Sequence, residues 1–94
     1  MSDHCVTVGT VVKIFPRQKC IGFIPTCTIT KGDVLALELE DPGPNGAKMT
    51  FTISSMRVDD VKRDTAEPGE RCAVLVDPFP AQYLWIGMPV LRNA

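Results

Sequence analysis

The chain has 94 residues, of which 45% are hydrophobic and 22% are charged, as in an ordinary globular domain. Intrinsic disorder is excluded, because it requires low hydrophobicity and a high net charge. The formal net charge of −1 argues against a dedicated nucleic-acid binder, since such proteins are usually strongly basic. The length predicts a single domain over residues 1–94, with room for one core but not for a deep catalytic cleft.

The chain carries no recognisable address for export or for a membrane. Residues 1–5 lack both a positive region and an apolar region, so no secretory signal is expected. The apolar stretch 78–91 is too short to cross a bilayer and contains three prolines. We therefore expect a cytoplasmic protein without membrane contact.

The cysteines do not have the spacing of a metal site. No C-x-x-C pair occurs among Cys5, Cys20, Cys27 and Cys72. Zinc-ribbon and thioredoxin-like structures are therefore disfavoured. We expect reduced thiols in the core, and neither a metal nor a cofactor. A disulfide-bonded secreted protein is the alternative.

The first third of the chain shows short β-rich runs divided by turn residues, without a helical repeat. The run Val6–Phe15 is rich in Val, Thr and Ile and ends at a polar turn over Pro16–Lys19. The next run, Cys20–Ile29, contains Pro25, which predicts a bent strand because proline cannot donate to a ladder. A turn over Thr30–Asp33 follows.

Two strands with one wet face are predicted in the middle of the chain, over Val34–Glu40 and Lys48–Met56. The dipeptide Asn45–Gly46 between them is a strong hairpin signal. The inward-facing residues are Leu35, Leu37 and Leu39 in the first strand and Met49, Phe51 and Ile53 in the second.

The last part of the chain alternates between charged and apolar segments. Arg57–Arg71 is rich in both signs of charge and predicts a short edge strand through Val58 and Val61, followed by an exposed loop. The remaining elements are a buried central strand at Cys72–Val76, an irregular segment or single helical turn at Pro78–Gln82, a last strand at Tyr83–Leu91, and a tail at 92–94. Six or seven short strands without a convincing helix predict a closed or nearly closed antiparallel barrel.

The order of these elements resembles a known barrel. The segments that carry the resemblance are Val8–Val11, Ile21–Ile24, Ile29–Leu35, Phe51–Val58 and Ala66–Ala73. They include a Gly-x-Val strand, a Lys-Gly-Asp turn, a Ser-Met strand end and a Gly-Glu turn. The chain is similar to the second domain of translational GTPases such as elongation factor Tu and initiation factor two, and is even closer to the C-terminal barrel of the collagenase-like peptidases.

The resemblance implies an all-β fold over residues 6–91, a six- or seven-stranded antiparallel β-barrel of the translation-factor second-domain type. The sequence departs from the pattern at Gly87–Met88, where related barrels place a Gly-Asp turn, and at Pro78–Pro80. It contains no G-x-x-x-x-G-K-[ST] motif, so GTP binding is not implied. The resemblance implies a standalone accessory barrel. In translation factors this barrel helps to hold the acceptor end of aminoacyl-tRNA or touches ribosomal RNA.

One candidate binding surface is a basic hairpin with an aromatic residue. Its members are Lys13, Phe15, Arg17 and Lys19, with Lys31 possible as a fifth. Such a surface suits phosphate contact and base stacking. The alternative is an ordinary soluble hairpin tip.

A second candidate is an aromatic face near the C-terminus. In a strand, Tyr83 and Trp85 would share a face with Gly87, while Leu84, Ile86 and Met88 would share the other. Both faces do not fit into the core of a small barrel. We therefore expect one face to contact a protein partner or a second copy, and closure of the core is the alternative.

The remaining polar groups point to no catalytic centre. They are the His4–Cys5 pair, the Glu38 and Glu40 carboxylates, the Ser54–Ser55 hydroxyls and the mixed charges of 59–64. None has the partners that acid–base, nucleophilic or metal chemistry requires. We therefore expect a non-catalytic module that binds a protein partner or a ribonucleoprotein. The alternative is an accessory subunit that completes an enzyme, such as a collagenase-like peptidase, encoded on another chain.

Overall fold

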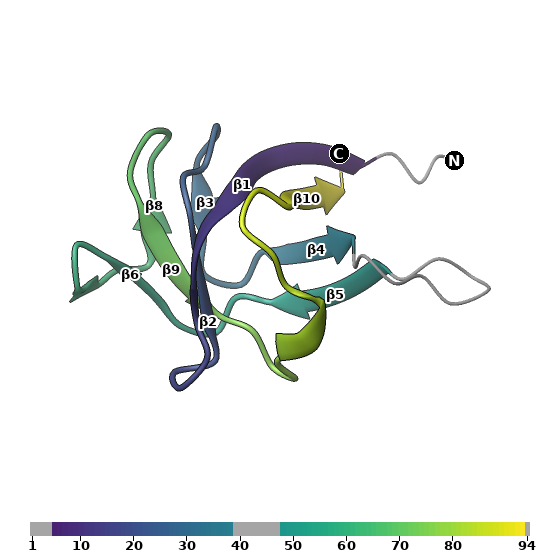
Figure 1. Cartoon of the computed structure of the whole chain (residues 1–94). Coiled ribbons are helices and arrows are strands. Elements are labelled where there is room, and N and C mark those ends of the chain that lie inside the picture. The colour runs from purple at the N-terminus through teal and green to yellow at the C-terminus, as the bar shows by residue number, and fades with distance from the viewer. Residues whose placement is uncertain (1–4, 39–47, 94) are drawn as a thin grey trace.

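The computed structural model describes residues 5–38 and 48–93, which form an antiparallel β-structure with one 3-10 turn. Eight strands form one curled sheet in the order β5-β4-β10-β1-β2-β9-β6-β7, and β3 pairs with β8 beside it (Figure 1). The elements are β1 (Cys5–Phe15), β2 (Cys20–Phe23), β3 (Ile29–Thr30), β4 (Val34–Glu38), β5 (Lys48–Thr52), β6 (Met56–Val58), β7 (Val61–Lys62), β8 (Thr65–Ala66), β9 (Cys72–Leu75), the 3-10 helix η1 (Ala81–Tyr83) and β10 (Pro89–Asn93). The all-β barrel class is confirmed. Strands are more numerous than expected because β3, β7 and β8 are two-residue pieces.

The long strand β1 belongs to both halves of the sheet. Its first half pairs with β10, and its second half pairs with β2. The register shifts between Thr7 and Gly9 and again between Val11 and Lys13, and such bulges increase bend and twist. Figure 1 shows β1 curving from the half that contains β10, β4 and β5 into the half that contains β2, β9 and β6.

Gly9 sits where β1 bends most closely over β2. A Cβ atom at this position would lie 2.7 Å from Cδ2 of Phe23 and 2.8 Å from the carbonyl oxygen of Ile24. Real side chains do not tolerate such distances, so any larger residue must displace β2. Phe23 is itself completely buried and occupies the centre of the core. The bend of β1 and the packing of Phe23 therefore depend on the same missing side chain.

The core follows the predicted alternation in the part of the chain that the structure describes. Leu35, Leu37, Phe51 and Ile53 are buried, and Met49 packs against the core from its margin. Predictions at Leu39, Glu40 and Asn45–Gly46 fall outside the described residues. The β4–β5 pairing is nevertheless antiparallel, from Val34 opposite Thr52 to Glu38 opposite Lys48.

The prediction that Cys72–Val76 is covered on both faces is wrong. Cys72 and Val74 are buried, whereas Ala73 and Leu75 are only half-buried. The strand is central, between β2 and β6, but its second face lies on the outside of the curled sheet. A central position in the sheet therefore does not bury both faces, since no second layer covers the outer one.

The last strand begins later than the sequence predicts. Gly87, with φ of +99°, occupies a turn that Met88 N–H closes on the carbonyl oxygen of Trp85 at 3.3 Å. The paired register with β1 begins at Pro89, opposite Thr10, although the backbones of Gly87 and Met88 already bond to Val11. Arg92 and Asn93 of the expected tail belong to this strand, because they pair with Val6 and Cys5 of β1. The Arg92 side chain also donates to the carbonyl oxygen of Thr28 at 3.2 Å.

Polar turns occur where the sequence places them. The β1–β2 turn covers residues 16–19, and Val76 N–H donates to the carbonyl oxygen of Lys19 at 2.9 Å. Gly32, with φ of +100°, lies in the turn before β4. The first of these turns places β2 beside β1, and the second leads into β4.

We expect Gly9→Ala to reduce the free energy of unfolding by about 1–3 kcal/mol, the usual cost of overpacking a core. Gly22→Ala is the matched control in β2, because its Cβ would meet no atom closer than 3.4 Å. Urea unfolding of both variants measures the difference. Equal stabilities of the two variants would show that the Gly9 contact does not constrain the fold.

We expect the stability to fall above pH 9 through Cys72. Burial raises the pKa of this thiol from 9.0 to about 12 in the folded protein. The unfolded chain loses the proton first, so the stabilisation is complete below pH 9 and is lost as the pH rises towards 12, at up to about 1.4 kcal/mol per pH unit. Urea unfolding of wild type and Cys72→Val between pH 8 and 11 should show a shallower decline in the variant. Parallel declines would mean that this thiol does not titrate as described.

Candidate binding groove on the outer sheet face

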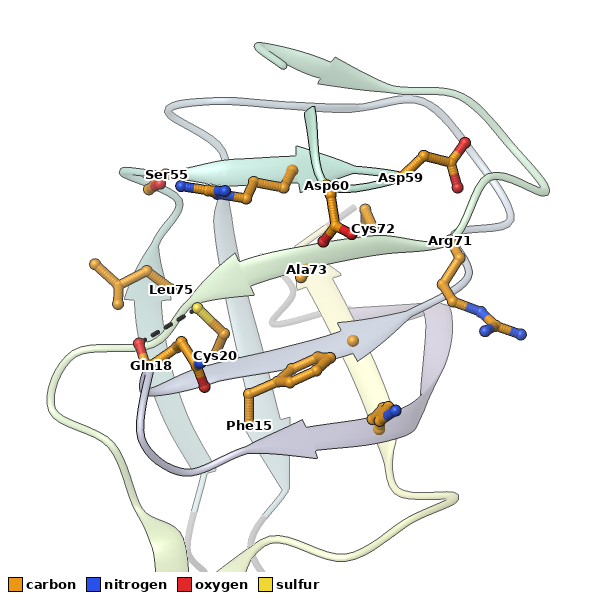
Figure 2. Close-up of a pocket in the computed structure, with 13 residues that line it drawn as sticks. Phe15, Gln18, Cys20, Ser55, Asp59, Asp60, Arg71, Cys72, Ala73 and Leu75 are labelled. Atoms are coloured by element: carbon orange, nitrogen blue, oxygen red, sulfur yellow. Dashed lines mark hydrogen bonds between the residues drawn. The ribbon is translucent and has the colours of Figure 1, made fainter. Parts of the chain in front are cut away.

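A groove of about 710 Å³ lies on the outer face of β1, β2, β9 and β6 (Figure 2). Its lining residues are Lys13, Phe15, Gln18, Cys20, Gly22, Ser55, Arg57, Asp59, Asp60, Arg71, Cys72, Ala73 and Leu75. The groove is open, with apolar and charged groups side by side. Volumes of this order suit a ligand group rather than a single ion.

The middle of the groove is one cross-strand row. Lys13 pairs with Gly22, Gly22 pairs with Ala73, and Ala73 pairs with Arg57. Neighbouring strands lie about 4.8 Å apart, so the two cationic residues stand at opposite ends of a row roughly 14 Å long. The two small residues between them leave the sheet surface uncovered, and the groove exists for that reason.

The next row supplies an apolar floor. Phe15 pairs with Cys20, and Cys20 pairs with Leu75. Cε2 of Phe15 would lie 3.4 Å from a Cβ on Gly22, so the ring extends over the position where β2 has no side chain. Lys13 Nζ lies 5.6 Å from the centroid of this ring, within the range of a cation–π contact. One face of the half-buried ring is thus held beside a cation.

The rim carries charges of both signs. Arg71 stands at one end of the groove, and Asp59 and Asp60 form the hairpin turn between β6 and β7 above β9 (Figure 2). With Lys13 and Arg57, the lining holds three cations against two carboxylates. The groove is therefore weakly positive on a chain whose formal net charge is −1.

Cys20 places a thiol on the groove floor. Its Sγ donates to the carbonyl oxygen of Gln18 at 3.4 Å, as the dashed line in Figure 2 marks. Burial raises the pKa of this thiol, and the nearby Arg57 charge offsets part of that rise. The neutral thiol is a poor nucleophile, since the thiolate is the reactive form. Cys20 therefore acts as a small apolar surface here.

The structure brings together only part of the predicted basic hairpin. Lys13 and Phe15 line the groove. Arg17 and Lys19 lie in the exposed β1–β2 turn and do not line it. Lys31 lies in the turn before β4, where its N–H donates to the carbonyl oxygen of Asp64 at 2.7 Å, and it too is outside the groove.

Arg57 and Arg71 are the groove cations that the sequence did not single out. Arg57 was visible as the exposed residue between the apolar Met56 and Val58, an alternation that predicts an outward side chain. Its position opposite Lys13 depends on β9 lying between β2 and β6, and the sequence does not state that pairing.

The predicted aromatic face is not a strand. Tyr83 ends η1 and is half-buried, while the neighbouring Leu84 packs against the core. Trp85 and Ile86 are 41% and 58% exposed. The expectation of two alternating faces is therefore wrong, because η1 and the turn at Gly87 take the place of a strand here. Of the two aromatic residues of the predicted face, Trp85 is exposed and Tyr83 is half-buried, and a partner contact there stays a prediction.

Residues 5–38 and 48–93 show neither a metal site nor a membrane-spanning helix. No group of three or more His, Cys, Asp or Glu side chains is placed to hold a metal ion. The same residues contain no helix that is long and apolar enough to span a membrane. Cys20, Cys27 and Cys72 are free thiols; Cys72 is buried as expected, whereas Cys20 and Cys27 are only half-buried.

Comparisons with known proteins find fold relatives only. Neither protein-family models nor curated proteins match the sequence. Two structures of the C-terminal domain of a U32 peptidase from Geobacillus thermoleovorans are similar, one with a TM-score of 0.72 and 18% identity over 94% of this chain and 99% of that one, the other with 0.71, 19%, 94% and 91%. A bacterial selenocysteine-specific elongation factor, EF-Sec, is similar with a TM-score of 0.68 and 17% identity, over 99% of this chain and 15% of that one. Both expected kinds of barrel relative are thus present, and at these identities they show the fold alone.

We expect the hairpin at the groove rim to be stabilised by Asp60→Gly. Asp59 and Asp60 have φ of 53° and 64°, the left-handed values of a two-residue hairpin turn that favours Asn-Gly. Removing the second Cβ relieves a cost of about 1 kcal/mol. Thermal unfolding should show a higher Tm than wild type, whereas Gly69→Asp, at φ of +88°, should lower it. A lower Tm for Asp60→Gly would mean that the carboxylate makes a compensating interaction.

Proposed function

We propose that this chain is a non-catalytic binding module whose groove holds an unpaired segment of single-stranded RNA. The observation that carries the proposal is the Phe15 ring, which lies over Gly22 between Lys13 and Arg57. Single-stranded nucleic acids are bound by this combination, in which aromatic rings stack the bases and cations contact the backbone. Residues 6–91 would act as one module in the cytoplasm.

The expected affinity is modest. Stacking on one aromatic ring contributes about 1–3 kcal/mol per base, and each neutralised phosphate of a single strand adds about −0.7 to the salt slope. With Asp59 and Asp60 on the rim, a duplex carrying dense charge on both strands is disfavoured. The groove therefore suits a short unpaired segment, for example within a ribonucleoprotein.

A second candidate is an accessory subunit that completes an enzyme on another chain. The observation that favours it is the similarity to the isolated C-terminal domain of a U32 peptidase, which this chain covers over 99% of that domain's length. A partner enzyme that stays bound to this chain after RNase treatment would support this candidate. A partner released by RNase would support the RNA-binding module.

The RNA proposal is tested by fluorescence anisotropy with a labelled single-stranded oligouridylate. We expect Phe15→Ala to weaken binding about 10-fold, which corresponds to about 1.4 kcal/mol. The double variant Lys13→Ala/Arg57→Ala should reduce the salt slope by about 1.4, because two cations leave the groove.

The charge-matched control is Arg17→Ala/Lys19→Ala, which removes two cations that lie in the turn rather than in the groove. It should leave binding within about two-fold of wild type if the groove is the site. Equal losses from the two double variants would show a diffuse charge effect instead. No binding by wild type at low salt would reject the RNA proposal.

A further inference from the structure

Trp85 and Ile86 form an exposed apolar projection next to the edge of β1 at Val11, hereafter the knob. Gly87 N–H donates to the carbonyl oxygen of Val11 at 2.7 Å, and Val11 N–H donates to the carbonyl oxygen of Met88 at 2.9 Å. The indole packs on its own turn, since its Cζ3 would lie 3.5 Å from a Cβ on Gly87. The knob is therefore ordered by backbone hydrogen bonds although its side chains face water.

The knob lies in an unusually uncharged part of the chain. Between Cys72 and Leu91 the only formally charged residue is Asp77. Val12, next to the strand residue that holds the knob, is 38% exposed. Depletion of charge together with an exposed Trp is typical of the centre of a protein interface.

The groove described above has the features that would receive such a knob. Its floor is apolar at Phe15 and Leu75, and Lys13 and Arg57 stand at the two ends of its central row. Cations bind preferentially to the face of an indole ring. A second copy of this chain thus offers a concave surface whose chemistry suits Trp85.

Knob and groove lie on opposite edges of β1. The knob is bonded to the edge of β1 at Val11, and the groove begins across the strand at Lys13. The hydrogen bonds at Val11 keep the knob outside its own groove, and neither knob residue lines it. A two-fold axis along β1 would place each knob over the partner's groove, with Val12 near the axis.

We propose that two copies of this chain form a symmetric dimer in which the knob of each copy enters the groove of the other. Reciprocity doubles the buried surface, which matters because one exposed indole contributes only about 100 Å² of the roughly 800 Å² per partner that a stable interface buries. The contact is isologous and closes at two copies. It also occupies the groove that the proposed function assigns to RNA, so RNA binding and dimerisation exclude each other.

The test is sedimentation velocity of the full chain from about 1 µM to about 500 µM, the range in which a weak dimer forms. We expect the mass to rise from monomer to dimer and the emission of Trp85, the only tryptophan, to move to shorter wavelength. Ile86→Ser and Phe15→Ala should each weaken the dimer at least 10-fold. Val61→Ser is the matched control, because Val61 is 59% exposed on β7 outside the groove.

Mixing the Ile86→Ser and Phe15→Ala chains tests whether the knob of one copy enters the groove of the other. An Ile86→Ser chain keeps its groove and a Phe15→Ala chain keeps its knob, so the mixture retains one intact contact and should associate more tightly than either variant alone. Wild-type dimerisation that Phe15→Ala leaves unchanged would overturn the knob-in-groove contact. A strict monomer at the highest concentration would overturn the dimer.

The RNA arm separates the two proposals. Adding oligouridylate to wild type should dissociate the dimer, and Ile86→Ser should bind the RNA at least as tightly as wild type. RNA binding by a strictly monomeric wild type would reject only the dimer. A dimer that persists while no RNA binds would reject only the RNA proposal.

Discussion

The close approach of β1 to β2 at Gly9 is the constraint on which the rest of the structure depends. With no Cβ at that position, β1 lies directly against the Phe23 ring, and the register shifts on either side turn the strand from one half of the sheet into the other. This bend of β1 also sets the strand register from Lys13 onward. The register decides which residues lie opposite Gly22 and Ala73. Core packing and groove geometry are thus consequences of one bend, because interiors are close-packed and transmit local displacements.

The groove is made by small side chains rather than by a separate element. Gly22 and Ala73 are central in their strands, where larger β-formers would give more packing surface. Their small size exposes sheet surface and lets the Phe15 ring extend over β2. The sheet has gained a recess on its outer face, whereas its inner face is filled by buried residues such as Phe23 and Val74. A recess of this kind can be filled or reshaped by a single methyl group.

The sequence predicted well what local patterns determine. Alternation identified the inward side chains of β4 and β5, and turn residues located the chain reversals at 16–19 and Gly32. It failed where the outcome depends on non-local pairing. The groove cation Arg57 faces Lys13 only because β9 pairs with both β2 and β6. The apolar run after Tyr83 looked like a strand because apolar content alone does not reveal that Gly87 would take a positive φ. Of the predicted aromatic face, only Trp85 is exposed, because Tyr83 ends η1 and is half-buried.

A dimer and an RNA segment that compete for one groove would make RNA affinity depend on protein concentration. Only the free groove binds RNA, so the apparent dissociation constant rises with the fraction of chains held in dimers. By thermodynamic linkage, bound RNA weakens dimerisation by the same factor by which dimerisation weakens RNA binding. The knob sequence then affects RNA affinity without contacting RNA, through Trp85 and Ile86 alone. At low concentration the effect vanishes and the groove residues alone determine affinity. An RNA affinity that depends on protein concentration, and loses that dependence on dilution, is therefore expected when the dimer contact and the RNA share one groove. An RNA site remote from the dimer contact would not show this dependence.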